Sequence, residues 1–162
     1  MNIIFLNYGD PNDINQWSGT LYHIYHKLKE RHNVVVVGTE IYRQMNVYYS
    51  ANFKRGAFIP VDRYMGTINR LLSERLSHFV DFDVVFFGEI FFCALELNMP
   101  QVILSDMTFH QTLFVSQSPD SRNIEASLRF EKLLFDNASK IIYPTEWIKQ
   151  KAMKFYPVDE IL

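Results

Sequence analysis

The sequence contains very little cysteine and no long run of apolar residues. Cys93 is the single cysteine among 162 residues, which excludes a disulfide within the chain and favours a reducing compartment. The longest apolar tract, residues 84–97, is interrupted by Gly88, Glu89 and Glu96, so it cannot span a bilayer. The first residues lack the basic and apolar regions of a signal peptide. We therefore expect a cytoplasmic protein without a transmembrane segment, and leave a peripheral association with a membrane open.

Motifs that define several enzyme classes are also missing. After Leu6 the chain continues Asn7-Tyr8-Gly9-Asp10, which is not the G-x-G-x-x-G fingerprint of dinucleotide-binding enzymes. The sequence contains no Walker A motif and no G-x-S-x-G elbow, which argues against a P-loop NTPase and an α/β-hydrolase. The formal net charge of -2 gives no general attraction to nucleic acid or to an anionic membrane.

What the sequence does contain is a regular alternation of strand and helix patterns. Apolar runs rich in β-branched residues predict strands at residues 3–6, 34–38, 83–88, 101–105 and 140–143. Residues 39–60 are the least clear part, and residues 57–60 fit a short edge strand that Pro60 would end. Apolar residues spaced by three and four positions predict the helices. These begin at about residues 20, 62, 89, 123 and 146, with Asp62 and Thr145 as caps, and the first ends near residues 30–32.

This alternation predicts an α/β fold. Strands joined by helices over short connections give a parallel sheet with helices on both faces, a Rossmann-like doubly wound domain. The length fits one domain over residues 1–162. In such sheets, ligands bind beyond the carboxyl ends of the strands, where the strand order reverses. If the first and fourth strands flank that point, residues 10–20, residues 88–89 and residues 105–110 converge there.

The polar stretch at residues 7–20 lies between the first strand and the first helix. Ser18 stands where an N-cap belongs, and Gly19 leaves the first turn without a side chain. The free N–H groups and the dipole of a helix start attract anions, and Gly19 would let a phosphate approach. A larger residue at Gly19 should then weaken anion binding and leave stability nearly unchanged. A long loop before a capped helix explains the same pattern, and both interpretations stay open.

Four other polar residues have both a functional and a structural interpretation. Asp106 follows a central strand, where its carboxylate could orient or deprotonate a bound hydroxyl, or simply cap the next helix. Glu131 faces the apolar side of its helix and therefore needs hydrogen-bonding partners, which favours a structural role. His23 and His26 have the spacing of metal ligands, but no third ligand is indicated, so we expect neither a metal nor a cofactor.

Three segments together resemble the N-terminal half of family 4 glycosyltransferases of the GT-B fold. They are DPNDINQWSGT at residues 10–20, SDMTF at residues 105–109, and Glu131 followed by NASKIIYPTEW at residues 137–147. The resemblance covers essentially the whole chain. It implies two Rossmann-like domains that face a cleft, and transfer of a sugar from a nucleotide-sugar with retention at the anomeric carbon.

The resemblance also implies roles for particular residues. Ser18, Gly19 and Thr20 match the loop near the donor phosphates, and Asp106 matches the acceptor-side position as the candidate catalytic residue. Glu89 and His110 lie in the converging segments and are further candidates for substrate binding. The implied partners are a nucleotide-sugar donor, a sugar or other hydroxyl acceptor, and a C-terminal donor-binding domain in cis or in trans.

The donor-binding domain of that family is absent from this chain, which leaves two hypotheses. The chain is the acceptor-binding domain of a retaining glycosyltransferase, inactive or nearly so by itself. Alternatively, it is a stand-alone Rossmann-like binding module that docks to a separate donor-binding subunit. The sequence identifies neither the donor nucleotide nor the acceptor.

Overall fold

The computed structural model describes residues 1–54, 61–88, 95–106 and 121–156. Its centre is a parallel sheet of five strands in the order β2-β1-β3-β4-β5. The strands are β1 (Asn2–Leu6), β2 (Asn33–Val37), β3 (Val84–Phe87), β4 (Gln101–Leu104) and β5 (Lys140–Ile142). The predicted α/β class with a parallel, Rossmann-like sheet is therefore confirmed, and each of the five main predicted strands is present.

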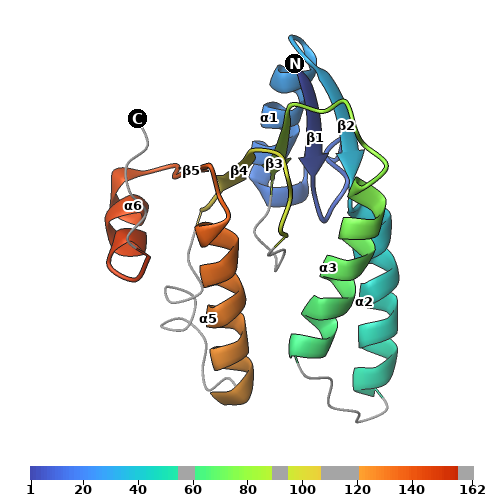
Figure 1. The fold of residues 1–162 in the computed structure, drawn as a ribbon, viewed down its shortest axis with the longest axis vertical. Helices are drawn as coiled ribbons and strands as arrows, with labels where there is room; N and C mark the ends of the chain where they lie inside the picture. Colours follow the sequence, from blue (N-terminus) through green and yellow to red (C-terminus); the bar gives the residue numbers. More distant parts are fainter. Residues whose placement is uncertain (55–60, 89–94, 107–120, 157–162) are drawn as a thin grey trace.

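Helices cover both faces of this sheet (Figure 1). They are α1 (Thr20–Lys29), α2 (Thr39–Lys54), α3 (Val61–Leu76), α5 (Ser121–Asp136) and α6 (Glu146–Met153). Alternate residues of each strand point to opposite faces, so the core has two parts. On one face Ile3 and Phe5 pack with Leu21 and Tyr25 of α1. On the other face the core contains Ile4, Leu6, Val85, Phe87 and Ile103 together with buried residues of α2, α3 and α5.

One helix was missed by the sequence pattern. Residues 39–54 form α2, where the sequence showed no clear element. Tyr42 and Met45 of α2 are buried, whereas Val47 and Tyr48 are 67% and 53% exposed. Because apolar side chains lie on both the buried and the exposed side, the helical period is hard to recognise. The predicted edge strand at residues 57–60 lies outside the described residues.

The other helices begin and end close to their predicted limits, with one exception. The helical spacing predicts five apolar positions for α3. Four of them, Met65, Ile68, Leu72 and Leu76, are buried, whereas Phe79 lies beyond the end of the helix and is half-buried. Thr145 is the N-cap of α6 as predicted, and its hydroxyl accepts a hydrogen bond from the Ile148 amide at 3.3 Å. The helix predicted at residues 89–97 does not include residues 95–97, which have no regular structure, and its remainder lies outside the described residues.

Candidate functional site

The carboxyl ends of the strands share one edge of the sheet, and the strand order reverses between β1 and β3. The chain leaves β1 through the polar loop of residues 7–19 and enters α1, whereas β4 is followed by Ser105 and Asp106. One strand, β3, separates β1 from β4, so the ends of β1 and β4 lie roughly 10 Å apart. This is the edge at which doubly wound sheets bind ligands.

The loop after β1 is folded by its own carboxylates. Asp10 accepts hydrogen bonds from the backbone amide and side-chain amide of Asn12, at 2.9 and 3.0 Å. Asp13 accepts the same pair from Asn15, at 3.0 and 3.1 Å. The hydrogen bond from the Asn15 backbone is the main reason that the pKa of Asp13 is lowered. These two aspartates shape the loop that carries Ser18, a structural task that the sequence pattern had not assigned to them.

Ser18 and Gly19 both have left-handed backbone conformations. Their φ angles are 52° and 81°, and Ser18 is a positive-φ residue that is not glycine. Such a conformation costs free energy in a residue with a side chain, and it occurs at ligand sites more often than elsewhere. The loop ends in a short 3-10 helix, η1 (Gln16–Gly19), and Gly19 itself is the N-cap of α1. The prediction that Ser18 is the N-cap is therefore wrong.

No side chain caps the start of α1. Gly19 provides no side chain that could accept from the first amide groups of the helix. The backbone changes from left-handed at Gly19 to right-handed at Thr20, an arrangement that turns successive N–H groups toward one side. Ser18 and Thr20 are exposed next to these groups. The predicted anion-binding geometry of residues 18–20 is thus compatible with the backbone.

The expectation about stability at Gly19 is wrong. A Cβ atom at this position would lie 3.3 Å from the carbonyl oxygen of Ile14, in a residue whose φ is +81°. Gly19 is also buried beneath the loop. A larger side chain therefore affects folding as well as any bound anion.

Two buried polar atoms near the strand ends have no hydrogen-bond partner within the described parts of the chain. They are Oδ1 of Asn7, a residue that is 1% exposed, and Oγ of Ser105, a residue that is 0% exposed. The Asn7 side-chain amide donates to the Gly9 carbonyl at 3.0 Å, which fixes its orientation. A Cβ at Gly88 would lie 3.0 Å from Asn7 Oδ1, so this oxygen is beside the end of β3.

An unpaired buried polar group is costly, so each such group in a folded chain calls for an explanation. Asn7 and Ser105 follow β1 and β4 directly, so both belong to the edge where the strand order reverses. Both residues lie in segments that the sequence pattern had indicated, residues 7–20 and 105–110, but neither was predicted as a site residue. The available signal was a polar residue placed immediately after an apolar strand.

The remaining predicted site residues are only partly described. Asp106 is half-buried and follows Ser105 at the end of β4, so it belongs to the same edge as Ser18, Gly19 and Thr20. Gly88 continues β3, and its amide donates to the Leu6 carbonyl at 3.0 Å. Glu89 and His110 lie outside the described residues.

A second group of polar side chains lies between α5 and the end of α6. Glu131 is 8% exposed, and the Tyr156 hydroxyl donates to its Oε2 atom at 2.5 Å. Burial, followed by the hydrogen bond to Glu131, raises the pKa of Tyr156 above its usual range. Burial and then the Glu131 charge raise the pKa of Tyr143 to about 12. The expectation that Glu131 has a buried carboxylate with a hydrogen-bond partner is confirmed.

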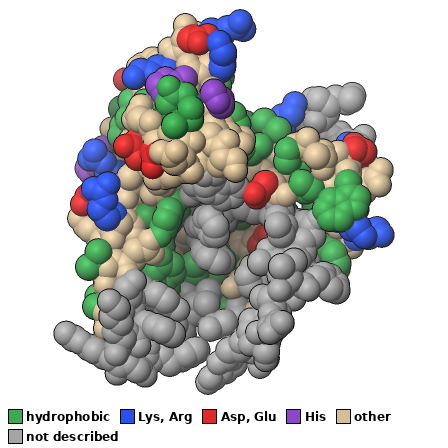
Figure 2. All heavy atoms as spheres, turned by 180° about the vertical axis from the view of Figure 1, so that it is seen from behind, with side chains coloured by type: hydrophobic (Ala, Val, Ile, Leu, Met, Phe, Trp, Pro, Cys, Tyr) green, Lys and Arg blue, Asp and Glu red, His purple; other side chains and the backbone are tan. Residues whose placement is uncertain are grey.

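The outer surface of α1 combines histidines with basic side chains. Figure 2 shows these residues gathered on one part of the molecule. His23, Lys27, Arg31 and His32 line a shallow hollow there, and Lys27 pairs with Glu30 at 2.8 Å. Within the described ranges, no three histidine, cysteine, aspartate or glutamate residues are grouped so that they could hold a metal ion. Among the helices of these ranges, none has both the length and the apolar character needed to cross a bilayer.

Comparison of the chain with protein-family models, with curated proteins and with solved structures finds no match.

Proposed function

We propose that this chain is the acceptor-side domain of a retaining glycosyltransferase, which transfers a sugar from a nucleotide-sugar donor to a hydroxyl acceptor. The observation that carries the proposal is the left-handed backbone at Ser18 and Gly19, at the uncapped start of α1, on the edge where the strand order reverses. The resemblance of three segments to family 4 glycosyltransferases supplies the reaction class.

The donor phosphates would bind at the start of α1. When the bond between the anomeric carbon and the phosphate oxygen breaks, the leaving diphosphate gains negative charge. Amide groups and the positive end of a helix dipole stabilise such a charge. Ser18 and Thr20 add exposed hydroxyl groups next to these amides.

The acceptor hydroxyl would bind nearer to the end of β4. Asp106 can accept a hydrogen bond from this hydroxyl and orient it. Ser105 Oγ and Asn7 Oδ1 are buried atoms on the same edge that lack partners in the described chain, so a bound hydroxyl could satisfy them. The separation of roughly 10 Å between the ends of β1 and β4 leaves room for a sugar ring between donor phosphate and acceptor.

A second, donor-binding domain would close the site. Ile14 in the loop after β1 is 51% exposed, and Trp147 at the start of α6 is 63% exposed. Hydrophobic side chains are visible at the surface over α6 in Figure 2. Ile14 and Trp147 are separate exposed apolar side chains that a docking partner at this edge could cover. They suit the second hypothesis equally, in which the chain is a binding module that docks to a separate donor-binding subunit.

Nuclear magnetic resonance titration tests the proposed donor site. We expect UDP-glucose or GDP-mannose, added at millimolar concentration to the 162-residue chain, to shift the amide resonances of Ser18, Gly19 and Thr20. The corresponding nucleosides, which lack phosphate, should leave these resonances unchanged. Equal shifts with nucleoside and nucleotide-sugar, or shifts confined to other parts of the chain, would exclude an anion site at the start of α1.

A further inference from the structure

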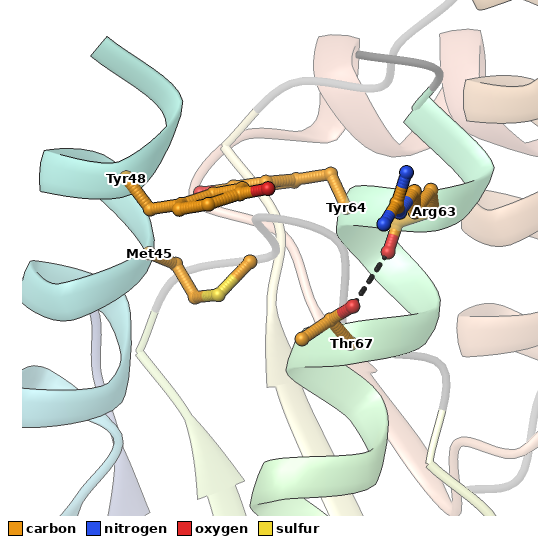
Figure 3. Close-up of a pocket in the computed structure, with 5 residues that line it drawn as sticks. All are labelled: Met45, Tyr48, Arg63, Tyr64 and Thr67. Carbon is orange, nitrogen blue, oxygen red and sulfur yellow. Dashed lines mark hydrogen bonds between the residues drawn. The ribbon is translucent and has the colours of Figure 1, made fainter. Parts of the chain in front are cut away.

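A small pocket lies between α2 and α3, away from the residues described above. Met45, Tyr48, Arg63, Tyr64 and Thr67 line a cavity of about 240 Å³. Figure 3 shows the rings of Tyr48 and Tyr64 extending toward one another from the two helices, with the Met45 side chain below them. The two helices thus present two aromatic rings and a thioether to one small space.

The tyrosines give this pocket apolar surfaces with polar rims. Tyr48 is 53% exposed, and Tyr64 is half-buried with its hydroxyl donating to Asn46 Oδ1 at 3.3 Å. Met45 is 9% exposed and closes the pocket on the side of the core. An aromatic ring offers a flat apolar surface, and a tyrosine hydroxyl adds a hydrogen-bonding group at its end. This combination suits a ligand that is itself apolar on one face and rich in hydroxyls at its edge.

Arg63 adds a positive charge. Its side chain is exposed, and in the described ranges its guanidinium forms no ion pair with a carboxylate. The neighbouring carboxylate, Asp62, instead pairs with Arg129 of α5. Guanidinium groups bind carboxylates and phosphates with two parallel hydrogen bonds, so Arg63 favours an anionic group on the ligand.

The pocket lies beyond the carboxyl edge of the sheet, as the candidate site does. α2 begins at Thr39, whose hydroxyl donates to the Gly9 carbonyl in the loop after β1 at 2.8 Å. Met45 and Tyr48 lie about 1.7 and 2.5 helical turns further on, roughly 9 and 14 Å along the helix axis from Thr39. Figure 1 shows α2 and α3 continuing beyond the carboxyl ends of the strands. A ligand in the pocket could therefore belong to the same molecule as a group bound at the strand ends.

We propose that this pocket binds one acidic monosaccharide unit of the acceptor, with its ring against Tyr48 and Tyr64 and its acidic group on Arg63. The proposal rests on the proposed function, which supplies a saccharide acceptor. A cavity of about 240 Å³ is small for a nucleotide and suits a single sugar ring. The unit held here would lie at a distance from the reacting hydroxyl and would select acceptors that carry an anionic sugar.

The 162-residue chain allows a direct test with simple sugars. We expect methyl glucuronide to shift the resonances of residues 45–48 and 63–67, with a dissociation constant in the millimolar range. Methyl glucoside, which has the same ring without a charge, should bind at least five-fold more weakly. Binding of glucose 6-phosphate as strong as that of methyl glucuronide would indicate a site for acidic sugars in general, and much weaker binding would indicate a site for carboxylates. Acetate and inorganic phosphate test whether the anion alone is enough.

Matched variants assign the interaction to individual side chains. Arg63→Gln should abolish the preference for methyl glucuronide over methyl glucoside, and Tyr48→Ala should weaken the binding of both sugars at least three-fold. Val47→Ala and Arg70→Gln change an exposed residue of the same helices outside the pocket, and should leave binding unchanged. Tyr48 and Arg63 are both exposed, so we expect both pocket variants to fold.

Three results would overturn the proposal: no shifts at residues 45–48 and 63–67, equal binding of neutral and acidic sugars, or competition by acetate or phosphate as strong as that by the sugar. The nucleotide-sugar titration at residues 18–20 reports separately on the proposed function. Loss of the donor-site shifts with retained sugar binding would refute the glycosyltransferase and leave the pocket, whereas the reverse result would refute the pocket alone.

Discussion

At the scale of single residues, Gly19 decides whether the loop after β1 can join α1 in its observed shape. Replacing it with alanine forces a side chain into a left-handed conformation and brings the new Cβ to 3.3 Å from the Ile14 carbonyl oxygen. We expect Gly19→Ala to lower the free energy of unfolding by about 1–2 kcal/mol. Urea unfolding followed by circular dichroism measures this difference.

Gly66 is the matched control for that substitution. It lies inside α3, and a Cβ at this position would meet no heavy atom within 4 Å apart from its chain neighbours and the backbone of its own helix. Because glycine in a helix costs conformational entropy, Gly66→Ala should stabilise the protein by about 0.5–1 kcal/mol. If both variants change stability in the same direction, the backbone conformation at Gly19 is not the cause.

At the scale of elements, the contact between Tyr156 and Glu131 joins the segment after α6 to α5. Tyr156→Phe removes the donor from a buried carboxylate, so the free energy of unfolding should fall by about 1–3 kcal/mol. Hydrogen exchange should also show faster opening of α6 than of β1 in this variant. Tyr143→Phe removes a buried hydroxyl without a partner in the described chain and should change stability by no more than about 0.5 kcal/mol. Equal losses in the two variants would show that the hydrogen bond to Glu131 does not contribute to holding α6.

The elements also show what the sequence can and cannot reveal. Strands such as β3 are buried throughout, so a continuous apolar run was enough to locate them. α2 was missed because Val47 and Tyr48 place apolar groups on its exposed side. The same Tyr48 lines the pocket between α2 and α3, so the residue that obscured the helix is also a candidate for ligand binding.

At the scale of the whole molecule, the carboxyl edge of the sheet could be predicted from the order of strands and helices alone. The positions of Ser18, Gly19 and Asp106 at this edge followed from their places just after strands. Asn7 and Ser105 also directly follow strands, but the sequence alone does not show that each is buried without a partner, which is a property of the folded chain. The left-handed conformation of Ser18 is likewise set by the folded loop and not by its residue type.

For the whole molecule, we expect weak binding of the nucleotide-sugar donor and no transfer of sugar by this chain alone. In the proposed enzyme a second domain supplies further hydrogen-bond donors to the diphosphate, and without that domain water weakens each contact at the start of α1. Calorimetric titration with nucleotide-sugars should give a dissociation constant near the millimolar range, which corresponds to a binding free energy of about -4 kcal/mol. A radiolabelled-sugar assay should detect no product. Micromolar donor binding, or transfer without a partner, would contradict the proposed division between two domains.

The position of β1 inside the sheet, between β2 and β3, has a consequence for biosynthesis. The Asn2 amide bonds to the Asp83 carboxylate, a partner 81 positions later in the chain. At roughly 5–20 residues per second, a ribosome needs about 4–16 s to deliver that partner after β1 has been made. During this interval Ile3, Phe5 and their neighbours can pair with β2 but lack β3. The nascent chain therefore carries an unfinished apolar strand, which makes it a candidate client for chaperones that bind at the ribosome.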